Sequence, residues 1–190
     1  MNIVKILISL VLVAVLAVGL FIWAGVYNIA ANDPHWPVTT EILELVRERS
    51  IEVRSEDLLP PKSLAPDLLA DAATGYAEMC AQCHLAPGMD ESELHDGLYP
   101  QPPVFYKGKH ESHDEKETFW VIKNGIKLTG MPSWGGVHSN DEIWALVRFV
   151  GRLPGMTQQE YQKLTGEEPG HRENGGGHSH GGPADTEHAH

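Results

Sequence analysis

The stretch that decides the fold is residues 76–84, which read YAEMCAQCH. Its two cysteines, Cys80 and Cys83, are the only ones in the chain, and His84 follows the second one directly. Thiols this close in sequence do not form the framework of disulfides that holds a small secreted domain together. The pair is therefore predicted to belong to a binding site.

The order cysteine, two other residues, cysteine and histidine is typical of covalent haem attachment. Cys80 and Cys83 can each form a thioether with one haem vinyl group, and His84 then lies beneath the iron as its ligand. A thioredoxin-like dithiol would follow a strand, and a zinc site would need a second pair of ligands, but the sequence offers neither. A chance match on a helix is the remaining alternative. We predict one covalently bound haem c.

A helix is predicted to carry the motif. From Pro66 onward, small and apolar residues recur at helical spacing, so one face of this helix should be buried, with Cys80 at its end. The residues of that face are Leu69, Ala72, Ala73, Tyr76, Ala77 and Cys80.

Two further helices are predicted on the C-terminal side. One covers residues 115–124 and closes at Gly125, a position where helices often turn left-handed. The other begins at a capping box formed by Ser139 and Glu142 and stops at Gly151. Its buried face should comprise Ile143, Leu146, Val147 and Val150. No stretch has the pattern of a strand, so the predicted fold class is all-α.

Residues 87–108 form a long stretch with several prolines and glycines between the helix that carries the motif and the helix predicted over residues 115–124. A loop of this length is hard to tolerate in a small domain unless it wraps around a large group. This stretch therefore gives independent support for a cofactor.

Met131 is the predicted second axial ligand of the iron. It lies in the sequence Thr129-Gly130-Met131-Pro132, where the proline favours an extended backbone and Gly130 lets the chain approach a flat macrocycle. Three other methionines are better explained as core residues, and four histidines are further alternatives. These residues are Met79, Met89, Met156, His95, His110, His113 and His138.

Residues 66–154 resemble the class I cytochrome c family, in which a helix ends in the haem motif, a proline loop follows and a later loop supplies a methionine. The family's aromatic residue before the motif corresponds to Tyr76, and Trp144 on the last helix is its expected partner. Residues 97–103 resemble the proline loop, in which a backbone carbonyl orients the proximal histidine. Three prolines are candidates for this role: Pro100, Pro102 and Pro103.

The resemblance implies an electron-transfer protein and not an enzyme. With His84 and Met131 on either side of the iron, no position is open to a substrate, and thioether ligation raises the reduction potential. Trp120, Trp134 and Phe105 are candidates either to pack around the porphyrin or to serve as ordinary core aromatics. A haem sensor or ligand-binding protein is the alternative if Met131 does not bind the iron.

Residues 6–31 carry no charge, and a helix of this length, at ~1.5 Å per residue, covers the ~30 Å core of a bilayer. We expect residues 1–31 to be a retained transmembrane anchor, with a cleaved signal peptide as the alternative. Lys5 before the run and Asp33 after it place the N-terminus inside. The sequence thus predicts a single-pass protein of the cytoplasmic membrane with its haem domain on the periplasmic side.

Three segments are predicted after the anchor. Residues 32–65 form a linker with a short, solvated amphipathic helix, and residues 66–155 form the cytochrome c domain. One face of the linker helix carries Ile42, Leu45 and Val46. Residues 156–190 form a flexible tail rich in glycine and histidine. The tail is either a solubilising end or a site for copper, nickel or zinc. Its histidines are His171, His178, His180, His188 and His190.

The chain carries 14 basic and 26 acidic side chains, a formal net charge of −12. This balance argues against a nucleic-acid partner. Redox partners are expected instead, such as a membrane oxidase, reductase or dehydrogenase. Four lysines near the methionine loop form either a docking patch or a solvated face. They are Lys107, Lys109, Lys123 and Lys127.

Overall fold

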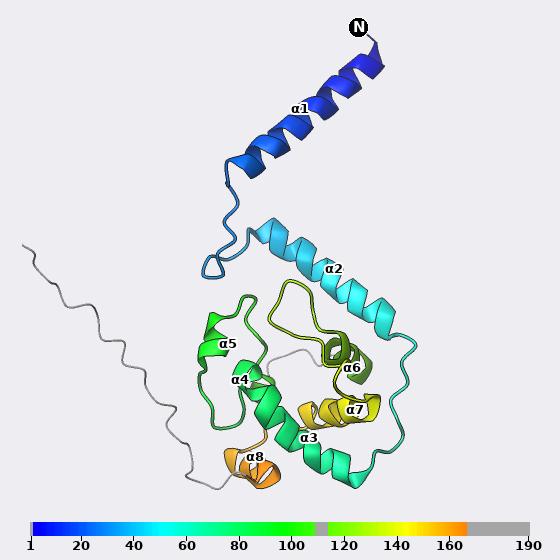
Figure 1. Ribbon diagram of the computed structural model, residues 1–190, viewed down its shortest axis with the longest axis vertical. Helices are drawn as coiled ribbons and strands as arrows, with labels where there is room; N and C mark the ends of the chain where they lie inside the picture. Colours follow the sequence, from blue (N-terminus) through cyan, green and yellow to red (C-terminus); the bar gives the residue numbers. More distant parts are fainter. Residues whose placement is uncertain (1, 109–113, 167–190) are drawn as a thin grey trace, which may run out of the picture.

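A computed structural model describes residues 2–108 and 114–166, which form helices joined by loops (Figure 1). No strand occurs in these two ranges, in agreement with the all-α prediction. The elements are α1 (Ile3–Trp23), α2 (Pro37–Ser55), α3 (Pro66–Met79), α4 (Ala81–His84), α5 (Glu93–Gly97), η1 (Phe105–Lys107), α6 (Glu115–Asn124), α7 (Asn140–Val150) and α8 (Gln158–Thr165). Helix α1 projects away from the rest of the chain, and α2 lies between α1 and the group formed by the other helices.

Helix α1 is apolar, and its side chains are exposed along its whole length. Its 21 residues cover about 30 Å at ~1.5 Å per residue. Within the described ranges it is the one helix long and apolar enough to cross a membrane, a criterion that a signal sequence near the N-terminus also meets.

Helices α3 and α7 pack against each other and form the centre of the domain. Helix α3 contributes two small buried residues, Ala72 and Ala73, which allow α7 to approach closely, and Tyr76 is fully buried beside them. Of the four apolar residues predicted to face inward on α7, all but the half-buried Val150 are buried. Leu69 differs from the prediction because it remains 40% exposed.

The expected contact between Tyr76 and Trp144 is wrong. The ring of Tyr76 packs against Phe149, with ring centroids 5.5 Å apart, whereas Trp144 stacks on Phe119 of α6 at 4.2 Å. Positions five apart on a helix, at ~100° per residue, differ in direction by about 140°. Trp144 and Phe149 therefore face different neighbours, and the second one faces α3.

Helix α6 ends at Gly125 as predicted, but the glycine does not adopt the left-handed helical conformation. Its φ is 68° and its ψ is −177°. A Cβ atom here would lie 2.8 Å from backbone atoms of Met131 and Pro132. Glycine is required because the loop that carries Met131 passes against the end of α6.

Helix α2 is longer than the predicted linker helix, with 19 residues. Its C-terminal part packs on α6 and buries Ile51 and Ser55. The predicted apolar face, which includes Ile42, Leu45 and Val46, is exposed. The sequence analysis did not anticipate the packed face because it carries only one large apolar residue.

Helix α8 corrects the prediction that residues 156–190 are all a flexible tail. Thr157 and Glu160 form a capping box at its start. Tyr161 is buried, and the helix packs against α3. One buried aromatic residue in eight gives little periodic signal, which explains why this helix was overlooked. The five histidines of the predicted metal-binding tail lie outside the described residues.

Candidate functional site

The two cysteines lie where α3 gives way to the short helix α4. The amide N–H of Cys80 donates to the carbonyl of Tyr76 at 2.9 Å, and Cys83 lies within α4. Both are free thiols and half-buried. Burial raises the pKa of the Cys80 thiol to about 12, with a smaller contribution from Cys83, so this thiol is protonated at neutral pH. One turn of chain thus presents both thiols.

His84 is oriented by the proline loop. Its Nδ1 atom lies 2.9 Å from the carbonyl oxygen of Pro103. Because a carbonyl can only accept, Nδ1 carries the proton in this hydrogen bond, and the lone pair of a neutral ring is on Nε2. Of the three prolines that the sequence left open, the structure therefore selects Pro103.

Phe105 supports the same imidazole from the side. Its ring stacks on that of His84, with centroids 4.6 Å apart and planes 17° apart. Phe105 begins η1, only two residues after Pro103. One segment of the loop therefore fixes both the rotation and the position of the His84 ring.

The chain directly after the motif is held by Tyr76. The hydroxyl of Tyr76 donates to the carbonyl oxygen of Leu85 at 2.7 Å, and burial raises the pKa of this hydroxyl above its ordinary value. Leu85 is buried and has a φ of 56°, in the left-handed region that non-glycine residues seldom adopt. The sequence analysis assigned Tyr76 an aromatic contact but missed this hydrogen bond, which no spacing rule reveals.

His95, one of the alternative ligands, contacts the motif itself. It is buried on α5, and its Nδ1 atom lies 2.8 Å from the carbonyl oxygen of Cys83. Ser92, which caps α5, donates through its hydroxyl to the carbonyl of Gln82. Helix α5 therefore stabilises the backbone of the motif.

Met131 lies in a loop that folds back on α6. Its carbonyl accepts a hydrogen bond from the amide of Ile126 at 3.2 Å, and its amide donates to the hydroxyl of Thr129 at 3.1 Å. The same hydroxyl donates to the carbonyl of Ile126 at 2.8 Å. The Met131 side chain is half-buried, so this loop presents a thioether at the surface of the domain.

Gly130 was predicted to let the backbone approach a macrocycle. In the structure its close neighbour is Leu98 of the proline loop: a Cβ at Gly130 would lie 2.6 Å from a methyl carbon of Leu98. The methionine loop and the proline loop therefore touch at this point.

The other candidate ligands are placed elsewhere or lie outside the described ranges. The side chains of Met79, Met89 and Met156 pack against the core around α3 and α7, as predicted for core methionines. His138 follows the methionine loop and lies beside the ring of Trp134, with centroids 5.8 Å apart. His110 and His113 are not among the described residues.

The described lysines of the group considered for docking lie in different surroundings. Lys123 donates to the side chain of Asn140 at 2.8 Å and lies over the ring of Phe119, so it joins α6 to the start of α7. Lys107 lies over Tyr106, and Lys127 is exposed. Lys109 lies outside the described residues.

Comparison with known families identifies this domain. Residues 67–150 match the family model described as cytochrome c oxidase, cbb3-type, subunit III. Residues 67–150 form a cytochrome c domain. The cytochrome c domain covers α3 to α7, and it indicates an electron-transfer protein that binds haem c covalently. The predicted resemblance, fold class and cofactor are thereby confirmed.

Two further comparisons add little beyond this match. No curated protein matches the chain. Among solved structures, the chain is similar to a reducing HAO-like protein complex of Kuenenia stuttgartiensis, with 23% sequence identity and a TM-score of 0.44. The similarity covers 50% of this chain and 47% of that one, so it spans about half the length of the neighbour.

The donor set at the site fits haem c. Two free thiols come from one turn of chain, and the carbonyl of Pro103 directs the lone pair of His84 to Nε2. A neutral imidazole in this tautomer is suited to bind iron through Nε2. Among the described residues no group of three or more His, Cys, Asp or Glu side chains forms a separate metal site.

Proposed function

We propose that the protein is a membrane-anchored carrier of single electrons. Cys80 and Cys83 would form the two thioethers to haem c, and His84 and Met131 would ligate its iron. Helix α1 anchors the chain in the cytoplasmic membrane, and the cytochrome c domain lies on the periplasmic side.

The hydrogen bond from His84 to the carbonyl of Pro103 carries this proposal most directly. It fixes the tautomer that ligation requires and makes the imidazole a better electron donor to a metal. A histidine on the surface of a helix would not need a half-buried backbone acceptor and a stacked ring for its orientation. Phe105 supplies that ring.

The bound haem supplies reversible one-electron exchange between ferric and ferrous iron. Met131 would supply a thioether as the second protein ligand of the iron, which would stabilise the ferrous form and raise the reduction potential. Two protein ligands leave no coordination site for a substrate. The chain's own residues thus favour electron transfer over chemistry on a bound molecule.

A membrane oxidoreductase is the proposed partner class. An anchor confines the domain to the membrane surface, which raises its effective concentration near membrane complexes. The family description names a cytochrome c oxidase, which favours an oxidase as the electron acceptor over a reductase or dehydrogenase. The acidic balance of the chain suits a partner with a basic docking surface.

An optical spectrum of the full-length, haem-loaded protein tests the ligand assignment. The oxidised form should show the weak far-red band of sulfur-ligated ferric haem, and the reduced form should not bind carbon monoxide rapidly. Met131→Leu should abolish the band and admit carbon monoxide, while Met89→Leu, a matched change in the core, should do neither. Absence of covalent haem would contradict the whole proposal, and haem that binds carbon monoxide in the unmodified protein would favour a sensor.

A further inference from the structure

The outward face of α2 is apolar and uncovered. Five aliphatic side chains on this face are between 48% and 70% exposed. They are Val38, Ile42, Leu45, Val46 and Val53. On a helix of about 28 Å, at ~1.5 Å per residue, they form a stripe that runs nearly from end to end. A stripe of this length is unusual on a surface in contact with water only.

This stripe lies opposite the face of α2 that packs on the domain. Ile42 and Ile51 are nine residues apart, which at ~100° per residue places them on opposite sides of the helix. Ile51 and Ser55 are buried toward α6, and Lys116 of α6 donates to the carbonyl of Glu56 at 3.0 Å. Because the domain covers one side of α2, the part of the stripe formed by Val38, Ile42, Leu45 and Val46 faces away from it. At the C-terminal end of α2, Val53 and Arg49 border a hollow that is also lined by Asp114, Lys116 and Glu117.

The start of α2 lies at the outer end of α1. Trp36, the residue before α2, makes edge-to-face contacts with Phe21 of α1 at 6.0 Å and with Tyr27 at 5.0 Å between ring centroids. In Figure 1, α2 runs across the direction of α1 and lies between α1 and the cytochrome c domain. The side of α2 that faces away from the domain is thus the side toward α1.

A polar junction fixes this arrangement to the domain. The hydroxyl of Tyr27 and Nδ1 of His35 are 2.8 Å apart, and the amide of His35 donates to the hydroxyl of Tyr99 at 3.0 Å. The rings of His35 and Tyr99 also meet edge to face at 5.0 Å. Since Tyr99 belongs to the proline loop, the end of the anchor is tied to the segment that orients His84.

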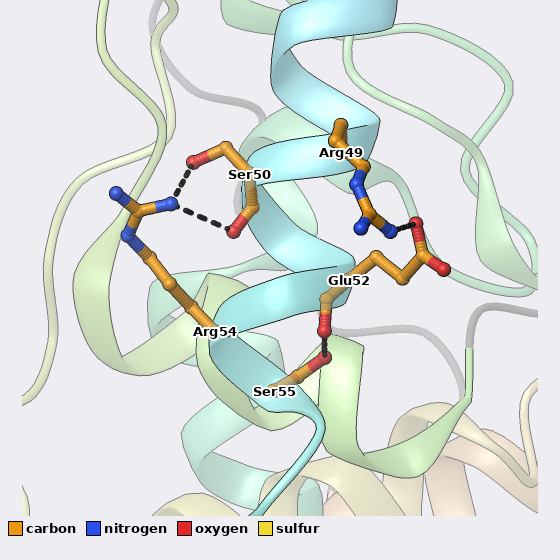
Figure 2. A network of polar contacts seen from close by, with 5 residues as sticks. All are labelled: Arg49, Ser50, Glu52, Arg54 and Ser55. Atoms are coloured by element: carbon orange, nitrogen blue, oxygen red, sulfur yellow. Dashed lines mark hydrogen bonds and ion pairs between the residues drawn. The ribbon is translucent and has the colours of Figure 1, made fainter.

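The side-chain contacts in the C-terminal half of α2 are made within the helix itself (Figure 2). Arg49 pairs with Glu52 at 2.7 Å, and Arg54 donates to Ser50, all within the helix itself. Arg49 lies between Leu45 and Val53 on the apolar face, and its side chain is 67% exposed. An arginine in this position can lay its aliphatic stem along the apolar surface and extend its guanidinium to phosphate groups.

We propose that α2 lies flat on the outer surface of the phospholipid bilayer, with its stripe inserted among the lipids and its opposite face holding the cytochrome c domain. The proposal rests on the anchoring role of α1 stated above. Interfacial helices typically bury their apolar face about 5–10 Å into the headgroup region. A second copy of the chain is a less suitable occupant, because it would enclose Arg49 in an apolar seam.

Nitroxide labels on the haem-loaded, full-length protein in nanodiscs of phosphatidylethanolamine and phosphatidylglycerol test this proposal. Thioether formation consumes Cys80 and Cys83, so an introduced cysteine becomes the single reactive thiol. Ile42→Cys and Val46→Cys place labels in the stripe, and Glu44→Cys and Glu48→Cys place them on other faces of α2 as matched controls. Val15→Cys in α1 reports whether the anchor is inserted. The measured quantity is the accessibility of each label to oxygen relative to a water-soluble nickel complex.

The ratio of oxygen accessibility to nickel accessibility at residues 42 and 46 should be several-fold higher than at residues 44 and 48. In smaller discs, whose lipid area no longer extends beneath α2, the ratio at residues 42 and 46 should fall. Equal, water-like ratios on all faces of α2, with a lipid-like ratio at residue 15, would overturn the proposal but leave the anchor intact. Water-like ratios with dipolar broadening between labels would instead indicate pairing of two chains. A water-like ratio at residue 15 would contradict the anchor itself.

Discussion

The histidine side and the methionine side of the proposed haem site are held by different kinds of contact. His84 lies between a backbone acceptor and a stacked ring, and the residue after it is held by the buried hydroxyl of Tyr76. Met131 is held by hydrogen bonds to residues within five positions of it, in a loop where Leu128 is 86% exposed. The first side therefore depends on the core of the domain, and the second depends mainly on its own loop. Changes on the two sides should consequently have separable effects.

The largest effect is expected on the histidine side. His84→Ala removes the proposed proximal ligand and the hydrogen bond to Pro103, so haem-loaded protein should fail to accumulate. Covalent haem retained on a denaturing gel measures this directly. His138→Ala, beside the methionine loop, should leave haem attachment unchanged. Normal amounts of haem-loaded His84→Ala protein would contradict the assignment of the proximal ligand.

A change at the base of the methionine loop should separate ligation from attachment. In Gly125→Ala, the new Cβ would lie 2.8 Å from the backbone of Met131 and Pro132, and the positive φ adds strain. Covalent haem should persist, while the far-red sulfur band should weaken or disappear. Gly136→Ala is the matched control, because nothing lies within 4 Å of its new Cβ. An unchanged band in Gly125→Ala would show that the loop tolerates displacement.

A smaller effect is expected from Tyr76→Phe on the histidine side. The carbonyl of Leu85 would lose its buried donor, which should lower the free energy of unfolding by about 1–3 kcal/mol. Urea unfolding of the haem-loaded protein measures this difference. Tyr106→Phe, which removes a hydroxyl donating to Met89 in a half-buried position, should cost less. Equal losses of unfolding free energy in the two variants would mean that the burial of the Tyr76 hydroxyl does not strengthen its contribution to stability.

The smallest effect concerns the helix that follows the methionine loop. Hydrogen bonds from the hydroxyl and then the amide of Ser139 hold the pKa of the Glu142 carboxyl below its usual range. Because the folded pKa is depressed, this stabilisation is present above the unfolded pKa of about 4.3 and is lost as the pH falls through the folded value. In Glu142→Gln, unfolding free energy should therefore depend less steeply on pH in that acidic window. Parallel pH profiles for the two proteins would contradict the capping-box contribution.

Local patterns in the sequence predicted the parts of the site that local chemistry determines. The C-x-x-C-H spacing, the end of α6 at Gly125 and the capping box at Ser139 all depend on residues close together in the chain. The choice of Pro103 over Pro100 and Pro102 could not be predicted in this way, because it depends on how a loop of some twenty residues closes on His84.

Contacts between helices were predicted less well. The pairing of Tyr76 with Phe149 depends on the rotation of α7 about its axis, which the sequence pattern constrains only coarsely when both faces of a helix are apolar. Helix α8 was not predicted because Tyr161 is its one buried residue, which leaves no apolar periodicity to recognise. The packed face of α2 was missed for a similar reason, since Ile51 is its one large buried residue.

Leu98 is where the two sides of the site meet, since it belongs to the proline loop and lies against Gly130 beside Met131. For the methionine loop to swing outward, the backbone at Gly130 must separate from Leu98. In the proposed haem site, the packing of Leu98 against Gly130 would therefore limit how often the thioether of Met131 leaves the iron. A smaller side chain at this position would shorten the lifetime of the closed loop without altering any group that binds the haem.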